Sequence, residues 1–272
     1  MMNRLQKILS TLLVLLASSA HAQTKVAIPN NGASIDGYWY PSGTPSSPQA
    51  PSIVALHGCG GMLQGKDKPN ARTVGYAKLL NSRGWHVLFV DSLSSRGVKS
   101  VCGGKNEVTQ AQRVTDVQAA VAYLAARSNV DAKRIGVLGF SHGGTSTLLS
   151  NDARVTYANA PRAFVAFYPG CSETSSRQMQ WQPARPVLMQ LGAADDWTSP
   201  LPCQSLAALH PNLVTQDTYA DAHHGFDADG TVARAVQLDT PKGVKIVHTG
   251  GNPAAKEAAQ AKLVAFFKEH FK

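Results

Sequence analysis

The stretch from Arg134 to Ser150 constrains the fold of this chain more than any other. Ile135 to Leu138 is a short apolar run with β-branched members, which predicts a buried strand, and the small residues after Gly144 predict a helix. Between them, Gly139-Phe140-Ser141-His142-Gly143 sets a serine on a sharp strand-to-helix turn. A Cβ at either glycine would collide with the neighbouring strand or helix. Such a turn exposes the Ser141 hydroxyl at a helix N-terminus, where free N–H groups can stabilise an oxyanion.

Residues 1–22 are typical of a secretory signal peptide. Arg4 and Lys7 precede an apolar run from Ile8 to Ala17, and Ala20-His21-Ala22 is a small-x-small cleavage site. The run is too short for a bilayer core of about 30 Å, which argues against the alternative of a retained N-terminal anchor. We therefore expect a mature protein that begins at Gln23, is periplasmic or secreted, and has no stable membrane anchor.

The charge of the chain is basic but dispersed. Its formal net charge is +9, which becomes +7 when residues 1–22 and their two basic residues are removed. No cluster of Lys and Arg and no interleaving of basic with aromatic residues occurs, so the sequence predicts no nucleic-acid partner. With 43% hydrophobic residues and no repeat or low-complexity tract, residues 23–272 are predicted to form one globular domain.

The predicted mature chain has four cysteines, Cys59, Cys102, Cys171 and Cys203. An exported chain meets an oxidising compartment, so we expect two disulfides. Three pairings are possible. We favour Cys59 with Cys102 and Cys171 with Cys203, because all four should lie in loops after strands on one rim, and these pairs would join loops of neighbouring strands. A metal site is the alternative, but no Cys-x-x-Cys or Cys/His ligand spacing occurs.

The order of predicted elements indicates an α/β fold with a mostly parallel sheet. Asn30-Asn31-Gly32 predicts a hairpin over Val26 to Tyr40, and strands then alternate with helices without a dividing linker. The predicted strands are Ser52–Leu56, Trp85–Val90, Ala163–Phe167, Val187–Leu191 and Val214–Tyr219. The predicted helices are Ala71–Arg83, closed by Gly84, then Glu107–Arg127, with Val114, Val117, Val121 and Leu124 on one face, and a last helix that Asn252 caps and that ends near His270.

An acid and a histidine follow the serine, each after its own predicted strand. Gly192-Ala193-Ala194-Asp195-Asp196-Trp197 follows one strand, and Asp221-Ala222-His223-His224-Gly225-Phe226 follows a later one. The ends of parallel strands share one rim, so the three side chains should meet there. A serine hydroxyl needs a histidine to take its proton and an acid to hold the imidazole, so the order Ser, Asp, His predicts a catalytic triad.

Each predicted triad partner has an alternative beside it. We prefer Asp195 to Asp196 as the acid, because it lies three residues after Gly192, and we expect Asp196 to cap the following turn. We prefer His224 to His223 as the base, because it precedes Gly225-Phe226, and we expect His223 to flank the pocket or bond a loop.

The remaining candidates concern the oxyanion and three other histidines. Leu56-His57-Gly58-Cys59-Gly60-Gly61 follows the third predicted strand, where a second oxyanion N–H is expected. We assign the two N–H groups to His142 and Cys59, with Gly60 as the alternative to Cys59. His57, His86 and the His142 ring are interpreted as structural or pocket-lining. A phosphate-binding loop is the other hypothesis for residues 56–61, but G-K-[ST] and a G-x-G-x-x-G before a helix are both absent.

Taken together, these motifs make the chain resemble the dienelactone hydrolase family of the α/β-hydrolase superfamily. The resemblance runs from about Ile53 to the end, through His57-Gly58, Asp91 with Arg96-Gly97, Gly139 to Gly144, Tyr168-Pro169-Gly170, Gly192 to Trp197 and His224-Gly225-Phe226. It implies the α/β-hydrolase fold and acyl-transfer chemistry. Dienelactone hydrolases proper carry a cysteine nucleophile and are cytoplasmic, whereas position 141 is serine and residues 1–22 indicate export, which argues against dienelactone itself as the substrate.

The sequence thus predicts an exported serine carboxylesterase that uses Ser141, Asp195 and His224 on a small-molecule ester, without a metal or organic cofactor. Tyr168 and Trp197 are candidates for an aromatic pocket wall, and Arg96 for a substrate carboxylate; the alternatives are that they pack the rim or, for Arg96, bind a nearby acid. One other hypothesis is a serine peptidase of the prolyl-oligopeptidase type; against it, nothing before Ile53 could form the large gating domain of those enzymes. Another is an inactive domain that binds a ligand or partner. The oligomeric state is not predicted.

Overall fold

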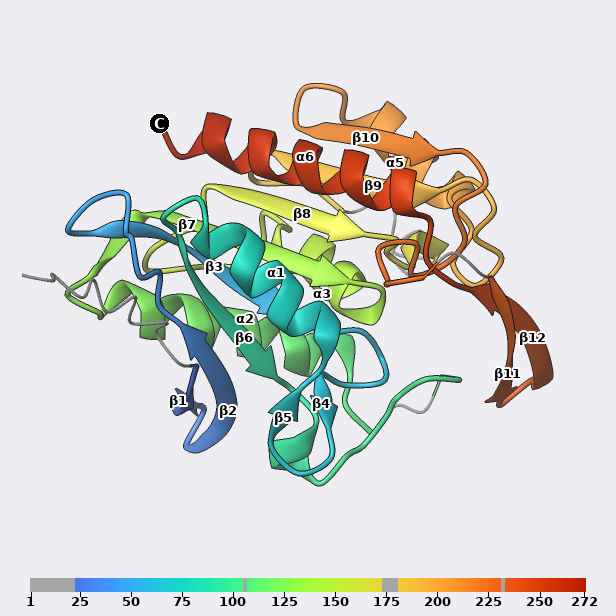
Figure 1. Cartoon of the computed structure of the whole chain (residues 1–272), viewed down its shortest axis with the longest axis horizontal. Helices are drawn as coiled ribbons and strands as arrows, with labels where there is room; N and C mark the ends of the chain where they lie inside the picture. Colours follow the sequence, from blue (N-terminus) through green and yellow to red (C-terminus); the bar gives the residue numbers. More distant parts are fainter. Residues whose placement is uncertain (1–22, 105–106, 173–180, 231–232) are drawn as a thin grey trace, which may run out of the picture.

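The computed structural model describes residues 23–104, 107–172, 181–230 and 233–272, so the predicted signal peptide lies outside the described residues. The main sheet has eight strands in the order β1-β2-β6-β3-β7-β8-β9-β10 (Figure 1). Its first three strands pair antiparallel, and the strands from β6 to β10 in that order pair parallel. The strands are β1 Thr24–Asn30, β2 Ala33–Tyr40, β3 Ala50–Leu56, β6 His86–Asp91, β7 Val130–Phe140, β8 Ala163–Phe167, β9 Val187–Gly192 and β10 Val214–Tyr219. This confirms the predicted α/β-hydrolase fold.

Helices cover both faces of the sheet (Figure 1). The buried side chains of α2 and α5 pack on one face and those of α1 and α6 on the other. Successive residues of β3 alternate between these two layers, since Val54 and Leu56 face the first and Ile53 and Ala55 the second. The helices are α1 Ala71–Asn81, α2 Gln110–Ala125, α3 His142–Ser150, α5 Leu201–Leu209 and α6 Pro253–His270. None of the helices in the described residues is both long and apolar enough to cross a membrane.

Several predicted ends match the structure and others shift for local reasons. β8 and β10 have the predicted bounds, and Asn252 caps α6 by accepting a hydrogen bond from the Ala255 N–H. The predicted helix Ala71–Arg83 ends two residues early, at Asn81. The predicted helix Glu107–Arg127 is shorter at both ends, because Thr109 forms a capping box with Gln112 and starts the helix at Gln110.

Elements that were not predicted surround the rim where the parallel strands end. β4 Leu63–Gln64 and β5 Lys68–Pro69 form a small ribbon, and α5 follows the β9 loop. β11 Arg234–Thr240 and β12 Gly243–Thr249 form a hairpin that stands away from the main sheet (Figure 1). The turn of this hairpin contacts the Gly103 segment, since a Cβ on Gly103 would collide with the Asp239 carbonyl oxygen.

Candidate active site

Ser141 lies on the sharp turn between β7 and α3, as predicted. Its backbone has φ 54° and ψ −118°, a strained conformation for a residue with a side chain. The flanking glycines are required there: a Cβ on Gly139 would collide with the Gly143 carbonyl oxygen, and one on Gly143 with the Leu56 and His57 carbonyl oxygens. The Ser141 N–H donates to the Phe167 carbonyl oxygen at 2.9 Å, which ties the turn to β8. These contacts maintain the strained conformation of Ser141 and fix the position of its backbone at the end of β7.

Ser141, His224 and Asp195 form a continuous hydrogen-bonded line. His224 Nε2 lies 2.8 Å from Ser141 Oγ, and His224 Nδ1 lies 2.8 Å from Asp195 Oδ2. His224 and Asp195 are buried, with 4% and 5% of their surfaces exposed. Since an imidazole with an acid at Nδ1 accepts through Nε2, this arrangement can withdraw the serine proton.

The two adjacent aspartates have different surroundings. Asp195 Oδ1 accepts hydrogen bonds from the N–H groups of Trp197 and Thr198, so Asp195 caps the turn as well as binding His224. The prediction that Asp196 caps this turn was wrong. Its carboxylate instead accepts from the His248 N–H at 2.8 Å and contacts His248 Nδ1 at 2.7 Å, because β12 runs beside it.

The two adjacent histidines also diverge. His224 lies between two aromatic rings, with the centroids of Tyr168 and Trp197 each 4.7 Å from its own. Its carbonyl oxygen accepts from Thr249 Oγ1 at 2.7 Å. His223 does not line the cavity that contains Ser141, and its ring centroid lies 5.7 Å from that of His248. Ring packing and a fixed backbone thus orient the imidazole of His224.

The loop after β3 lies beside Ser141, where the second oxyanion donor was predicted. A Cβ built on Gly58 would be 3.6 Å from Ser141 Cβ, which places the Gly58-Cys59 backbone against the serine. In the described residues, the backbone N–H groups of Cys59 and Gly60 have no hydrogen-bond acceptor. His142 is the first residue of α3, so its N–H has no intrahelical acceptor. Both predicted donors, and the alternative Gly60, are therefore free to bind an anion.

Three histidines that were interpreted as structural make contacts within the protein. His57 Nδ1 lies 2.7 Å from the Gly58 carbonyl oxygen, and its Nε2 accepts from the Ser92 N–H at 3.2 Å. His86 Nδ1 accepts from the Ser42 N–H at 2.9 Å. Burial, assisted by the charge of a nearby arginine, lowers the pKa values of His57 and His142 to about 3. Both rings are therefore neutral at physiological pH.

The predicted substrate-binding residues have three different positions. Trp197 lines the cavity that contains Ser141. Tyr168 is buried behind His224, and its hydroxyl donates to Asp227 at 2.6 Å, so it packs the rim. Arg96 binds both carboxylate oxygens of Asp116, at 2.9 and 2.6 Å, and does not line the cavity. The structure thus places Arg96 on a nearby acid, the alternative that the sequence had left open.

The cavity beside Ser141 has a volume of about 680 Å³. Its wall contains no charged side chain among the described residues. It is lined by Cys59, Val101, Cys102, Gly103, Gly104, Thr109, Gln110, Ala111, Ser141, His142, Thr145, Leu149, Gly170, Ser172, Trp197 and Thr198. No group of three or more His, Cys, Asp or Glu side chains suited to a metal ion occurs in the part of the chain that is described.

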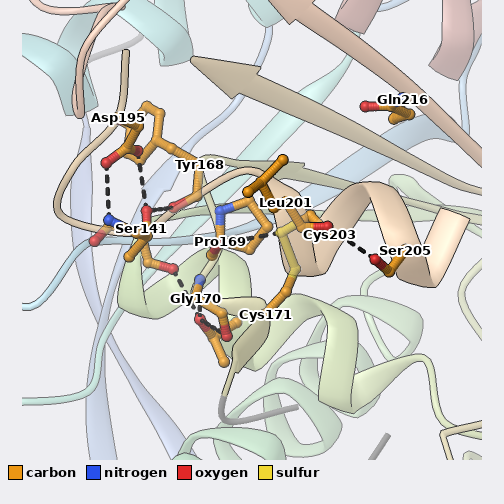
Figure 2. Close-up of a disulfide and its surroundings, with 12 residues drawn as sticks. Ser141, Tyr168, Pro169, Gly170, Cys171, Asp195, Leu201, Cys203, Ser205 and Gln216 are labelled. Atoms are coloured by element: carbon orange, nitrogen blue, oxygen red, sulfur yellow. Dashed lines mark hydrogen bonds between the residues drawn. A yellow bond between two sulfur atoms is a disulfide. The ribbon is translucent and has the colours of Figure 1, made fainter. Parts of the chain in front are cut away.

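Two disulfides, Cys59–Cys102 and Cys171–Cys203, flank this cavity, with the predicted pairing. Cys203, however, lies in the first turn of α5 and not in a loop. Figure 2 shows Pro169 and Gly170 between Ser141 and the second disulfide. The Gly170 N–H donates to Thr145 Oγ1 at 2.8 Å, so this segment is held to α3 on one side and to α5 on the other.

Two residues at the site were missed in the sequence. Thr198 Oγ1 lies 3.0 Å from Asp195 Oδ2 and 3.1 Å from His224 Nδ1, and it donates to the Tyr168 carbonyl oxygen. Arg113 of α2 is fully buried behind the serine turn. A signal for Arg113 was present, because it lies four residues before Val117 and so on the apolar face of its helix.

Solved structures with this architecture cover nearly the whole chain. A candidate dienelactone hydrolase from Klebsiella pneumoniae has a TM-score of 0.68 and 16% identity, covering 91% of this chain and 98% of its own. The dienelactone hydrolase-like promiscuous phosphotriesterase P91 from metagenomic libraries has a TM-score of 0.66 and 18% identity, covering 92% and 99%. The thermophilic esterase Est2 from Thermogutta terrifontis has a TM-score of 0.61 and 14% identity, covering 93% and 94%. At these identities the likeness shows the fold.

The family is set by sequence. None of the curated proteins matches this chain. The family model that matches is described as the dienelactone hydrolase family, a family of hydrolases, and it spans residues 35–271. That range includes every strand from β3 onward and all three members of the Ser141, Asp195 and His224 line. On this match, the chain belongs to the dienelactone hydrolase family.

Proposed function

We propose that this protein is an exported serine hydrolase that cleaves carboxylic esters through an acyl-enzyme intermediate. The observation that carries the proposal is His224, whose two ring nitrogens lie 2.8 Å from Ser141 Oγ and 2.8 Å from Asp195 Oδ2. This is the arrangement that turns a serine hydroxyl into a nucleophile. Family membership supports hydrolysis in general, and the serine at position 141 supports an oxygen nucleophile.

The proposed reaction has two halves. Ser141 Oγ attacks the ester carbonyl carbon while its proton moves to His224 Nε2, and Asp195 stabilises the imidazolium. The N–H groups of His142 and Cys59 hold the negative oxygen of the tetrahedral intermediate. When the intermediate collapses, the alkoxide leaves with the proton from His224. Water then attacks the acyl-enzyme by the same route, which releases the carboxylic acid and restores Ser141.

The cavity supports neutral esters of moderate size as substrates. Its described wall contains hydroxyls, an amide, glycines and Trp197 but no charged side chain, although the chain carries a net charge of +9. Arg96 is bound to Asp116 and is not available in the wall to receive a substrate carboxylate. The Thermogutta esterase that shares the fold has also been solved with propionate bound, which recommends short acyl chains for the first assay.

Export is a separate part of the proposal. The pattern of residues 1–22 supports a cleaved signal peptide, and two disulfides in the described chain suit an oxidising compartment. Intact-mass measurement of the protein from the periplasm or medium should give a chain that begins at Gln23. A mass that retains residues 1–22 would contradict cleavage.

The test of the chemistry combines labelling with turnover. The purified protein is incubated with a fluorophosphonate and assayed on p-nitrophenyl acetate, propionate, butyrate and octanoate. We expect one adduct on Ser141, turnover that falls as the acyl chain lengthens, and a loss of roughly 10⁴- to 10⁶-fold in Ser141→Ala. Ser205→Ala, at an exposed serine of α5, is the matched control and should keep wild-type activity.

Three outcomes would contradict the proposal. Retained activity in folded Ser141→Ala would remove the serine from the mechanism. Cleavage of a p-nitroanilide dipeptide in preference to the esters would favour a peptidase. Absence of both adduct and turnover on folded protein would favour a binding domain. For Arg96→Ala we expect equal turnover changes on neutral and carboxylate-bearing esters; a selective loss on the latter would restore Arg96 to the substrate site.

A further inference from the structure

Arg113 of α2 is a buried cation without a carboxylate in direct contact. Its surface is 0% exposed, and no ion pair within 4.0 Å joins it to an acid in the described residues. The carboxylate of Asp116, one turn further along the helix, is bound by Arg96 and by the Asn30 amide. Asp116 and Asp91 favour the charged form of Arg113 only from a longer range. A buried charge without a carboxylate in contact opposes folding, so such a residue calls for a functional explanation.

The two hydrogen bonds from the Arg113 guanidinium reach two different segments beside Ser141. Nη2 donates to the His57 carbonyl oxygen at 2.8 Å, and Nη1 contacts His142 Nδ1 at 2.8 Å. The first segment leads from β3 to Cys59, and the second is the first residue of α3. These are the two segments whose N–H groups are proposed to bind the oxyanion.

The contact with the first segment continues to the oxyanion donor itself. His57 is neutral, since burial and the charge of Arg113 lower its pKa to about 3. Its Nε2 accepts from the Ser92 N–H, so its proton is on Nδ1, which donates to the Gly58 carbonyl oxygen at 2.7 Å. That carbonyl belongs to the same planar peptide as the Cys59 N–H. Arg113 and His57 together therefore fix the direction of the Cys59 donor.

The contact with the second segment needs a neutral His142. Burial and the charges of Arg113 and His57 lower the His142 pKa to about 3, so Nδ1 can accept from the guanidinium. Arg113 itself stays protonated at neutral pH, because burial lowers its pKa only to about 10. A positive charge thus remains behind the turn in a region that excludes water, where its field acts strongly on a nearby anion.

We propose that Arg113 is a positioning residue for the oxyanion hole, in which one guanidinium holds the Cys59 and His142 segments in register and favours the negative charge that develops on the substrate oxygen. The inference rests on the proposed serine hydrolase. It assigns to a buried helix residue a role in the transition state and none in binding the ester ground state, so it predicts an effect on kcat and not on KM.

The experiment compares an ester with the thionoester in which sulfur replaces the carbonyl oxygen. Sulfur accepts hydrogen bonds weakly, so the ratio of kcat for ester over thionoester reports on the oxyanion hole and not on general stability. In Arg113→Met we expect kcat on the ester to fall about 10- to 100-fold and the ratio to fall about 10-fold, with KM within about threefold of wild type. Arg113→Lys, which keeps the charge but not both hydrogen bonds, should be intermediate.

Two controls separate this role from a structural one. Arg127→Met alters an arginine stacked on Trp39, with 4.5 Å from its guanidinium to the ring centroid, and should leave the ratio unchanged. The pH profile of kcat/KM should be the same in Arg113→Met and wild type, because His224 and Asp195 are untouched. A shifted profile would mean that the triad has moved and would overturn the assignment.

If Arg113→Met does not fold, the ratio of kcat for ester over thionoester is measured in variants of His142, which the guanidinium contacts. His142→Gln keeps an acceptor for the guanidinium and His142→Leu does not, so His142→Leu should lower the ratio more than His142→Gln. An equal ratio in both variants, or an unchanged ratio in folded Arg113→Met, would overturn the proposal for Arg113 alone. A wild-type protein that neither hydrolyses the ester nor reacts with a fluorophosphonate would instead overturn the proposed function, and the role of Arg113 with it.

Discussion

The nucleophile side of the cavity and its acid–base side are held in different ways. On the nucleophile side, Ser141 and the Cys59 segment are fixed by tight backbone contacts and by one buried cation, Arg113. On the acid–base side, Asp195 and His224 lie on two loops that are tied to the β11–β12 hairpin. The first side depends on the core of the domain, and the second on an appended element at the surface.

The acid–base side also contains a second Asp–His pair, which is exposed to solvent. Asp196 and His248 form a pair at 2.7 Å whose side chains are 44% and 46% exposed, beside the buried pair of Asp195 and His224 at 2.8 Å. Nearly equal distances therefore accompany opposite surroundings. A carboxylate has a strong electrostatic effect on a neighbouring histidine only where water is excluded. The comparison therefore predicts that substitutions at Asp195 and at Asp196 have very different effects on kcat.

The largest expected effect comes from Asp195→Asn. An amide at this position can donate from its NH₂ group to His224 Nδ1. This favours the unproductive tautomer, in which Nε2 carries the proton and cannot accept one from Ser141. We expect kcat on p-nitrophenyl acetate to fall by roughly 10³- to 10⁴-fold while the protein stays folded. The matched control is Asp196→Asn, which should stay within about threefold of wild type. Equal losses in the two variants would contradict the choice of Asp195.

The same contrast explains what the sequence could and could not predict. Ser141, the glycines around it and the bounds of β8, β10 and α6 follow from local patterns, since a turn, a cap and an apolar run are each written in consecutive residues. The hairpin was missed because its residues are mostly exposed and carry no core periodicity. Its pairing of His248 with Asp196 depends on a contact across 52 residues, which no local pattern reveals.

The next largest effect is expected from removal of the two disulfides. Both should stabilise the fold, but only one of them should affect kcat. They close loops with sequence separations of 43 and 32 residues, so the chain-entropy account gives each a similar stabilisation of about 4 kcal/mol. Cys59–Cys102 lines the cavity and holds a proposed oxyanion donor, whereas Cys171 and Cys203 are buried and do not line it.

Serine pairs at each disulfide test this difference. Both double variants should lose comparable stability in urea unfolding, but only Cys59→Ser with Cys102→Ser should also lose kcat, by about 10-fold, at temperatures where the protein remains folded. The measurement is kcat at 15 °C beside the unfolding midpoint. If Cys171→Ser with Cys203→Ser lowered kcat equally, the second disulfide would also position the active site, and the predicted difference between the two disulfides would be wrong.

Protonation of the neutral histidines behind the serine gives a smaller, pH-dependent effect. The pKa values of His57 and His142 are held at about 3, below the ordinary value near 6.5, because burial disfavours the charged rings. The unfolded chain then binds more protons than the folded chain below pH 6.5, so stability falls as the pH falls. Each ring contributes about 1.4 kcal/mol per pH unit in that range.

Urea unfolding at pH 7.5, 6.0 and 5.0 measures this slope. We expect His57→Asn to reduce the slope by about one proton relative to wild type, and His142→Gln to do the same. A slope that is unchanged in both variants would show that the two rings are charged in the folded protein. That result would also remove the neutral acceptor on which the contact between Arg113 and His142 depends.

The smallest effect is expected at the exposed pair. Partial burial opposes ionisation of Asp196, but hydrogen bonds from the His248 side chain and backbone outweigh it and hold the Asp196 pKa below its usual range. The stabilisation is therefore present above the unfolded pKa near 4 and is lost as the pH falls through the folded value. Because both side chains are nearly half exposed, water and salt screen the pair, and His248→Gln should lower the Tm at pH 6 by no more than about 3 °C at low salt. Added salt should shrink this difference. If His248→Gln instead lowered kcat by more than about 10-fold, the hairpin would take part in acid–base catalysis as well as support it. The exposed pair of Asp196 and His248 would then belong to the active site together with Asp195 and His224.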